Sequence, residues 1–326
     1  MTWLVTGGAG YIGSHVVRAL READAAVVVI DDLSTGLVGF VPEDVPLVRA
    51  NLLDGDTVRT TLDQHGVRGV IHIAGYKYAG ESVQRPLHTY RQNVSAMVTL
   101  LDAVTEAGID KFVFSSSAAT YGTPDTDLVD ETTPTAPESP YGESKLIGEW
   151  LLRDTAVAAP GFRHTSLRYF NVVGSGRDEL FDVSPFNLFP KVFDMLHRGQ
   201  TPRINGADYP TPDGTCVRDY VHVTDLAAAH VAAARALDDG VALAPVYNLG
   251  SGDGTSVREI MTAIREVTGI DFEPEVAERR PGDPARIVAA GELAARDLDW
   301  RMRHSLTDMV ASAWAARQHA GDAYPG

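Results

Sequence analysis

The chain has 326 residues, is 44% hydrophobic and carries a formal net charge of −16 at pH 7. This acidity excludes a general binder of nucleic acid or anionic membranes, although it leaves room for a local basic pocket. Cys216 is the only cysteine, which excludes an internal disulfide and a cysteine-based metal cluster. The sequence shows no membrane-length apolar run and no signal-peptide pattern at its start, so we expect a cytoplasmic protein.

Short apolar runs alternate with longer amphipathic stretches through the first half of the chain. The apolar runs predict buried strands at 2–6, 25–30, 45–50, 69–74 and 111–116. The stretches between and after them predict helices over about 11–23, 54–65, 86–107 and 141–157. Because strand and helix alternate, the pattern predicts an α/β fold with a doubly wound parallel sheet (Rossmann) covered by helices on both faces.

The pattern changes after residues 166–175, where Gly, Pro and polar turns such as NGADYPTPDG become denser. We therefore predict two domains, the first over 1–166 and a smaller C-terminal α/β substrate-binding domain over 167–326. The stretch APVYNLGSG (244–252) again has the composition of a strand followed by a turn. We expect the chain to cross back between the two domains near 215–250.

A glycine-rich turn joins the first predicted strand to the first predicted helix. Gly7, Gly10 and Gly13 have the spacing G-x-x-G-x-x-G, which suits a tight turn that lets the backbone approach a pyrophosphate. The helix N-terminus adds free N–H groups and the positive end of a dipole. Asp31 follows the second strand, 18 residues after Gly13, where a carboxylate binds the ribose hydroxyls and disfavours a 2′-phosphate. This context predicts NAD in preference to NADP.

Tyr141 precedes Lys145 by four residues in SPYGESK, so the two side chains share one face of a predicted helix. An ammonium beside a phenol favours the phenolate, and a base useful at neutral pH needs a pKa about three units below the usual tyrosine value of about 10. Ser117, at the end of the strand 111–116, is a candidate to hydrogen-bond a substrate oxygen. The structural alternatives are an ordinary helix pair and a serine that caps a turn.

Taken together, these motifs resemble the extended short-chain dehydrogenase/reductase family, and within it the UDP-sugar 4-epimerases. The resemblance runs nearly from end to end and includes GGAGYIG, VIDDLSTG, FSSSAATYG, SPYGESK and, most diagnostically, DYPTPDGTCVRDYVHV. It implies an isomerase of galactose metabolism that interconverts UDP-glucose and UDP-galactose by transient oxidation at C4 with bound NAD. It also implies a homodimer formed through the helices near 86–107 and 141–157.

The resemblance carries site residues over position by position. It implies Tyr141 as the general base, Lys145 as the partner that lowers its pKa, and Ser117 as the hydrogen-bonding serine. The implied cofactor-binding residues are Gly7, Gly10, Tyr11, Ile12, Gly13, Asp31, Asp32, Leu33, Ser34, Thr35, Gly36, Asn51, Leu52, Ile73, Ala74, Gly75, Lys77, Asn93, Ser115, Tyr141, Lys145 and Phe170. The implied substrate-binding residues are Lys77, Ser117, Tyr141, Asn171, Asn187, Leu188, Ile204, Asn205, Arg218, Arg280, Asp283 and Ile287. The two arginines suit a diphosphate, because a guanidinium fork makes charge-assisted hydrogen bonds. No metal is implied, and the histidines, such as His72 and His222, lack metal-ligand spacing.

Four positions depart from the family pattern. Asp32 stands where asparagine is common, and its charge is expected to weaken cofactor binding. Asn51 replaces an aspartate that meets the adenine amino group, and its amide oxygen can still accept that bond. Asn205 replaces an aromatic residue beside the uracil. Ile287 holds a position that controls the room beside the sugar C2 group, and its intermediate size leaves activity on N-acetylhexosamines open.

Several other functions compete with this interpretation. A 4,6-dehydratase needs an acid and a base directly after Ser117, where this chain has Ala118 and Ala119. Elimination is therefore excluded. A 4-epimerase of another UDP-sugar (UDP-GlcNAc/GalNAc, UDP-xylose/arabinose or UDP-glucuronate) shares the whole core and stays open. A catalytically silent NAD-binding sensor and a classical alcohol dehydrogenase, which would consume external cofactor, are the remaining alternatives.

Overall fold

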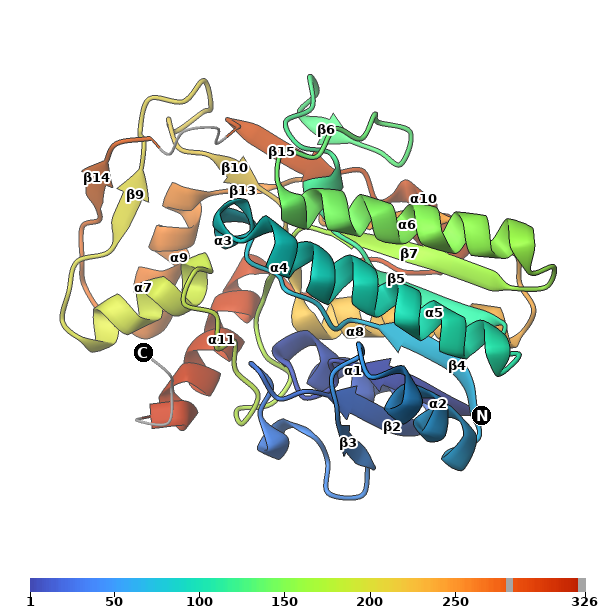
Figure 1. Cartoon of the computed structure of the whole chain (residues 1–326). Coiled ribbons are helices and arrows are strands. Elements are labelled where there is room, and N and C mark those ends of the chain that lie inside the picture. The colour runs from blue at the N-terminus through green and yellow to red at the C-terminus, as the bar shows by residue number, and fades with distance from the viewer. Residues whose placement is uncertain (280–283, 322–326) are drawn as a thin grey trace.

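The computed structural model describes residues 1–279 and 284–321. Its main feature is a seven-stranded sheet in the order β12-β7-β5-β4-β1-β2-β3, in which every paired neighbour is parallel. The strands are β1 (Thr2–Thr6), β2 (Ala26–Asp31), β3 (Leu47–Arg49), β4 (Val67–His72), β5 (Lys111–Ser115), β7 (Arg163–Tyr169) and β12 (Val246–Leu249). This confirms the predicted doubly wound parallel sheet (Figure 1).

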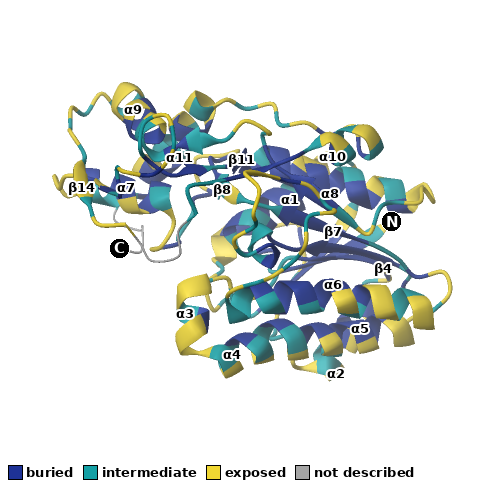
Figure 2. Ribbon diagram, turned by 90° about the horizontal axis from the view of Figure 1, so that it is seen from above, coloured by how far each residue is buried: buried dark blue, intermediate teal, exposed yellow. Residues whose placement is uncertain are grey.

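Helices cover both faces of this sheet because each face buries its own apolar cluster. One face packs α1 (Tyr11–Glu22), α8 (Val223–Asp238) and α10 (Glu292–Asp297) in a core that includes Val17, Leu226 and Trp300. The other packs α2 (Gly55–Gln64), α5 (Ala96–Glu106) and α6 (Pro140–Ala158) in a second core. Figure 2 shows α1 and α8 on one side of the strands and α5 and α6 on the other.

The predicted helix over 86–107 is present, but it is interrupted. Its parts are α4 (Pro86–Tyr90), a π-helical turn (Arg91–Ser95) and α5. A π turn adds a residue to the helix and often marks a functional position. Here it contains Asn93, whose Oδ1 accepts from the Tyr76 N–H at 2.7 Å and whose Nδ2 donates to the Tyr76 carbonyl at 3.0 Å. Hydrophobic periodicity does not reveal such an insertion, because the apolar stripe continues through it.

A second group of helices and strands gathers at one end of the sheet, on the left of Figure 1. Their apolar core joins residues of α7 (Leu188–His197), α9 (Val257–Thr268) and α11 (Leu306–Ala320). The smaller sheets are β13-β10-β15-β6, β11-β8 and β14-β9. Their strands are β6 (Leu128–Val129), β8 (Asn171–Val173), β9 (Arg203–Asn205), β10 (Val217–Arg218), β11 (Tyr220–His222), β13 (Thr255–Ser256), β14 (Glu275–Ala277) and β15 (Arg286–Ala289). The remaining short helices are α3 (Ala79–Gln84) and two 3-10 turns (Val38–Phe40 and Ala118–Thr120).

Residues 223–249 return to the large sheet after this excursion. α8 packs on the face that carries α1, and β12 pairs with β7 through Val246 and Ser166. The proposed boundary between residues 166 and 167 falls inside β7, and the division into two domains stays a prediction. Within the described residues, no helix is both long and apolar enough to cross a membrane.

Candidate active site

The turn after β1 needs its glycines for close backbone approach. Gly7 has φ +73°, which favours glycine, and a Cβ on Gly13 would lie 2.0 Å from the Gly7 carbonyl oxygen. α1 begins at Tyr11 behind Gly10, with no side-chain cap and no acidic residue in its first turn. Free N–H groups and a positive dipole end therefore face the space beyond the turn, which suits a phosphate.

Asp31, at the end of β2, is tied to this turn. Its carboxylate accepts from the Ala9 N–H at 3.0 Å and the Leu33 N–H at 2.8 Å. Burial raises the pKa of Asp31, while these hydrogen bonds oppose the increase. Leu33 to Gly36 then fold back beside the turn, where the Leu37 N–H donates to the Ala9 carbonyl at 2.9 Å. The predicted ribose carboxylate and the predicted phosphate turn thus form one unit.

Asp32 and Asn51, two of the departures from the family pattern, bond to each other. Asn51 Nδ2 donates to Asp32 Oδ2 at 2.8 Å, and the Ser34 N–H donates to Asp32 Oδ1 at 2.9 Å. Burial alone would raise the pKa of Asp32, but the hydrogen bonds from Ser34 and Asn51 outweigh it, so the pKa is lowered. The Asn51 oxygen also accepts from the Leu53 N–H at 3.0 Å. Hydrogen bonds from Ser34 and Asn51 therefore stabilise the added negative charge of Asp32.

Lys145 and Ser117 meet Tyr141 at the carboxyl end of β5. Lys145 Nζ donates to the Ser115 carbonyl at 2.8 Å and lies 5.9 Å from the centroid of the Tyr141 ring. Ser117 caps the 3-10 turn by accepting from the Ala119 N–H at 3.1 Å. Both the catalytic and the capping interpretation of this serine are therefore compatible with its position, since its side chain also lies close enough to Tyr141 to oppose the rise in the pKa of that phenol.

The electrostatics of this pair differ from the expectation based on spacing alone. Burial raises the pKa of Tyr141, and the hydrogen bond with Ser117 only partly opposes that increase. Burial also lowers the pKa of Lys145 to about 8, with Glu149 opposing. Desolvation disfavours the charged form of both groups, so the side chains of the protein leave Tyr141 a phenol at neutral pH. A second positive charge is therefore needed to make it a base.

A cavity of about 630 Å³ opens in front of these residues. It lies at the carboxyl edge of the sheet, where ligands bind in doubly wound folds. The predicted site residues that line it are Tyr11, Ile12, Lys77, Ser117, Tyr141, Phe170, Asn171, Asn187, Leu188, Asn205 and Arg218. The structure thus brings cofactor-binding and substrate-binding candidates from distant parts of the chain, between Tyr11 and Arg218, onto one cavity.

Other predicted residues lie behind or beside the cavity wall. The Ser115 hydroxyl bonds Nε2 of the buried His230 at 2.7 Å. Ile204 is buried in the core around α7 and α9. Ile287 pairs with Arg218 across β15 and β10 and packs in a cluster with Phe170. Arg280 and Asp283 lie outside the described residues.

Apart from Asn187 at its end, the sequence did not reveal the loop between β8 and α7 as part of the site. Asp182 lies 3.7 Å from Lys77 Nζ and accepts from Asn187 Nδ2 at 2.6 Å. The rings of Phe186 and Tyr78 are 5.0 Å apart between centroids. This loop has no periodicity, so no sequence pattern could indicate that it closes one side of the cavity.

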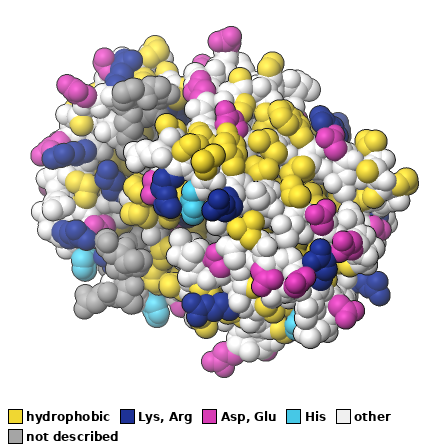
Figure 3. Space-filling view, viewed as in Figure 1, with side chains coloured by type: hydrophobic (Ala, Val, Ile, Leu, Met, Phe, Trp, Pro, Cys, Tyr) yellow, Lys and Arg dark blue, Asp and Glu magenta, His cyan; other side chains and the backbone are white. Residues whose placement is uncertain are grey.

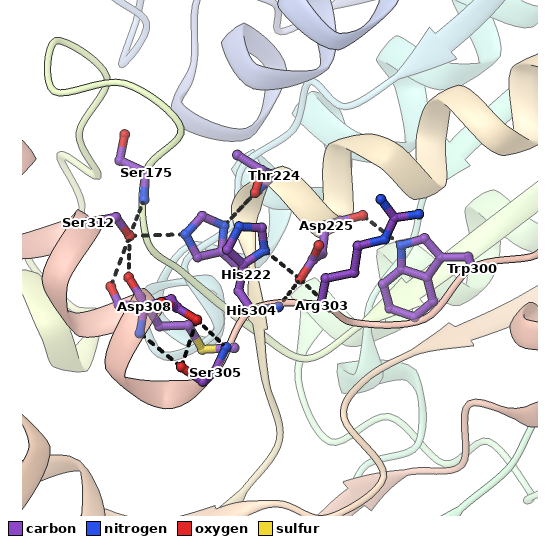
Figure 4. Close-up of polar contacts among 11 residues, drawn as sticks. Ser175, His222, Thr224, Asp225, Trp300, Arg303, His304, Ser305, Asp308 and Ser312 are labelled. Carbon is purple, nitrogen blue, oxygen red and sulfur yellow. Dashed lines mark hydrogen bonds and ion pairs between the residues drawn. The ribbon is translucent and has the colours of Figure 1, made fainter.

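The loop's start is held by a polar cluster (Figure 4). The Ser175 N–H donates to Ser312 Oγ at 3.1 Å, and His222 Nε2 lies 3.0 Å from the same oxygen. His304 stacks on His222 with centroids 4.0 Å apart and lies 3.0 Å from Asp225. Among the described residues no group of three or more His, Cys, Asp or Glu side chains could hold a metal ion. The cluster therefore anchors β8, and with it Asn171, to α11.

Comparisons with known proteins agree with this geometry. Residues 3–250 match the model of the NAD dependent epimerase/dehydratase family. The UDP-glucose 4-epimerase of Azospirillum brasilense is 45% identical over 311 residues, covering 94% of this chain and 89% of that protein. A solved UDP-glucose 4-epimerase has a TM-score of 0.95 at 40% identity over 100% of both chains. Another, from Stenotrophomonas maltophila with bound NAD and formylated UDP-arabinopyranose, has a TM-score of 0.94 at 37% identity over 99% of both chains.

Proposed function

Since the chain belongs to the NAD dependent epimerase/dehydratase family, we propose that it is an isomerase that interconverts UDP-glucose and UDP-galactose at C4. The observation that carries this proposal is the cavity itself. Ser117 and Tyr141 line one part of it, and Asn171, Asn187 and Arg218 line another. A proton-transfer site and a polar, partly cationic binding surface therefore face the same space.

The residues around the glycine turn fit NAD. The cradle at Gly7 and Gly13 has no room for a Cβ, and Asp31 lies at the end of the adjacent strand. Gly10 and Tyr11 would hold the pyrophosphate at the start of α1, and Asp31 would accept from the ribose hydroxyls. Asn93, which fixes the backbone of Tyr76, would position Lys77 near the nicotinamide ribose. When bound, NAD supplies a reversible hydride acceptor with a positively charged ring.

Tyr141 Oη takes the proton from the sugar 4-hydroxyl in this proposal and later returns it. Ser117 Oγ holds the sugar oxygen in line with Tyr141, since both side chains line the cavity. Lys145 lies behind the tyrosine ring and favours the phenolate by its charge. Ala118 and Ala119 follow Ser117 and cannot move protons, so the keto sugar is reduced again at C4 and does not proceed to elimination.

The nucleotide end of the substrate calls for cationic and amide donors. Arg218 and Asn187 line the cavity, and Arg218 would bind the diphosphate through charge-assisted hydrogen bonds. Asn205 lines the cavity as well, where we propose it contacts the uracil. Arg280 and Asp283, outside the described residues, remain predicted contacts.

The experiment is a discontinuous assay of purified protein without added NAD. Four sugars are compared: UDP-galactose, UDP-N-acetylgalactosamine, UDP-arabinopyranose and UDP-glucuronate, with products separated by chromatography. Conversion of UDP-galactose alone supports the proposal and indicates that Ile287 closes the C2 side. Conversion mainly of another sugar keeps the reaction and changes the substrate. No conversion, even with NAD added, contradicts the proposal and favours a silent binding protein.

We also propose that the protein is a cytoplasmic homodimer formed through α4, α5 and α6. Large apolar side chains are exposed there, with Leu87, Val98 and Trp150 exposed by 79%, 40% and 46%. Figure 3 shows hydrophobic side chains gathering over these helices. Large contiguous apolar patches are typical of interaction sites, and two helices from each copy would bury them. Sedimentation velocity of the wild type and of Trp150→Glu tests this, with Val276→Glu, an exposed apolar residue on β14, as control.

A further inference from the structure

A buried ion pair lies directly behind the candidate catalytic residues. Glu149 follows Lys145 by four residues on α6, so the two share a face of the helix. The Glu149 carboxylate accepts from Arg168 Nε at 2.8 Å and from a terminal guanidinium nitrogen at 2.5 Å. The Arg168 and Glu149 side chains are only 6% and 7% exposed. Arg168 belongs to β7, the strand next to β5.

The Glu149–Arg168 pair also binds Ser116, which lies between Ser115 and Ser117 in the sequence. Ser116 Oγ donates to Glu149 Oε1 at 2.5 Å, and the Ser116 N–H donates to the Leu167 carbonyl at 2.9 Å. Ser115, on one side, provides the carbonyl that binds Lys145 Nζ. Ser117, on the other side, lies beside Tyr141 and opposes the rise in the pKa of that phenol. The carboxylate of Glu149 therefore fixes the middle residue of the segment from which both neighbours reach the catalytic groups.

Arg168 also contacts the far end of this segment. Its guanidinium carbon lies 4.7 Å from the centroid of the Tyr121 ring. Tyr121 follows the 3-10 turn that Ser117 caps, and its hydroxyl donates to Asn248 Oδ1 at 2.7 Å. The ion pair thus touches residues 116–121 at both ends.

Stability alone does not account for such a pair, because apolar residues of the same volume often serve a buried position equally well. We propose that Glu149 and Arg168 are positioning residues: by fixing Ser116 they align the Ser115 carbonyl, the Ser117 hydroxyl and the ammonium of Lys145 with Tyr141. This inference rests on the proposed function, in which these groups move a proton.

The charges around Glu149 and Arg168 make their proposed role measurable in the pH dependence of the reaction. The titratable and charged groups that face it are Lys145 and Tyr141 on α6, His164 and Tyr169 on β7, His72 on β4, Tyr121 after β5, Glu131 after β6 and, through Ser115, His230 on α8. Burial lowers the pKa of His72 to about 3 and that of His230 to about 4, and it raises the pKa of Tyr121 and of Tyr169. These groups are therefore neutral near pH 7, and the charge that acts on Lys145 is that of Glu149, which Arg168 in turn balances.

Two single variants, one that removes the negative charge and one that removes the positive charge, distinguish this positioning role from simple packing. Glu149→Gln leaves Arg168 unbalanced, which disfavours the Lys145 ammonium, so the basic limb of the kcat/KM profile moves down by about one pH unit. Arg168→Met leaves Glu149 unbalanced, so the same limb moves up by about as much. The double variant returns the limb toward the wild type. The assay uses the NAD-loaded protein and UDP-galactose. Loss of packing alone would instead lower activity at every pH.

A third variant isolates the hydrogen bond. Ser116→Ala keeps both charges, so we expect kcat to fall by about tenfold or more while the basic limb stays in place and KM changes by less than about twofold. Arg163→Met, on the same strand as Arg168, is the matched control, because it removes only a half-exposed ion pair with Asp110 at 3.3 Å. It should leave kcat and the pH profile unchanged. If a single charge variant fails to fold, Ser116→Ala and the double variant still decide.

Two results overturn the inference: limb shifts in the same direction for both charge variants, or wild-type kcat in Ser116→Ala. A wild type that converts none of the four UDP-sugars overturns the proposed function instead. In that case the ionisation of Tyr141 is titrated by ultraviolet difference absorbance, comparing each variant with its counterpart that also carries Tyr141→Phe. Opposite shifts in that titration support the positioning role, and equal shifts overturn it.

Discussion

At the residue scale, the glycine turn shows how little space separates β1 from α1. A Cβ on Gly13 would lie 2.0 Å from the Gly7 oxygen, whereas a Cβ on Gly10 would lie 3.3 Å from the same atom. Gly10 also has an ordinary φ of −81°. The two glycines therefore differ in how much a methyl group would disturb them, although both belong to one sequence motif.

This difference makes Gly13→Ala and Gly10→Ala a matched pair. In Gly13→Ala the backbone must move, so we expect a loss of at least about 2 kcal/mol in the free energy of unfolding and of most bound NAD. Gly10→Ala should keep the fold and reduce NAD binding less. Bound NAD per chain after purification, together with denaturant unfolding, measures both. Equal losses in the two variants would refute the argument from the turn's geometry.

Tyr141 and Lys145 show, also at the residue scale, the difference between what spacing predicts and what burial determines. Their spacing correctly places both on one face of α6, but the raised pKa of Tyr141 depends on how deeply the fold buries the phenol. Burial is set by segments far away in the chain, so the spacing alone could not predict it. Tyr141→Phe should lower kcat by about 10³-fold or more and leave bound NAD and the melting temperature nearly unchanged. A variant with more than a tenth of wild-type kcat would exclude Tyr141 as the base.

At the element scale, a π turn interrupts the helical stretch 86–106 beside the candidate site. The π turn lets Asn93 bond both backbone groups of Tyr76, and its Nδ2 also donates to Ser144 on α6 at 2.8 Å. One side chain therefore joins the segment after β4 to the helix that carries Tyr141 and Lys145. The sequence predicts the helix and names Asn93 by resemblance, but the inserted turn has no signature in the apolar pattern.

Asn93→Ala tests this link. It leaves the N–H and carbonyl of Tyr76 without their partner, so we expect a loss of about 2 kcal/mol in the free energy of unfolding and weaker retention of NAD. Thr99→Ala on α5 is the control, because its hydroxyl bonds only the Ser95 carbonyl at the surface, and it should change stability by less than about 0.5 kcal/mol. Denaturant unfolding decides, and equal effects of the two variants would contradict the assignment.

At the scale of the whole molecule, the sequence predicts the sheet and its two helical layers, but not the polar contacts that join distant segments. Apolar runs and glycine turns act locally, which is why β1 to β5 and α1 follow from the pattern. The Glu149–Arg168 pair and the Lys77–Asp182 contact join positions 19 and 105 residues apart, as their numbers show. No local pattern relates such positions, so they become visible only in the fold.

Buried neutral histidines connect this packing to pH. Burial lowers the pKa of His15, His222 and His230 to about 4 and that of His72 to about 3. Because the folded pKa lies below the unfolded value of about 6.5, each contributes stability that is present above pH 6.5. That contribution is lost as the pH falls from about 6.5 to about 4, since the unfolded chain then binds protons first.

His222→Gln should therefore flatten this part of the stability profile. Its side chain can accept from the Thr224 N–H and donate to Ser312, as His222 does, but it cannot take up the proton. We expect the drop in the free energy of unfolding between pH 6.5 and pH 4 to shrink by up to about 3 kcal/mol relative to the wild type. His197→Gln at the exposed end of α7 is the control. An unchanged drop in His222→Gln would contradict the burial argument.

The central claim is that C4 is oxidised and reduced again within one cavity. The most direct measurement follows deuterium placed at C4 of UDP-galactose, converted in ordinary water by the purified protein without added NAD. The account predicts that UDP-glucose forms with its C4 deuterium retained, because hydride leaves and returns without meeting solvent. UDP-glucose with hydrogen from water at C4 would contradict it, since that result requires a proton-transfer route at carbon.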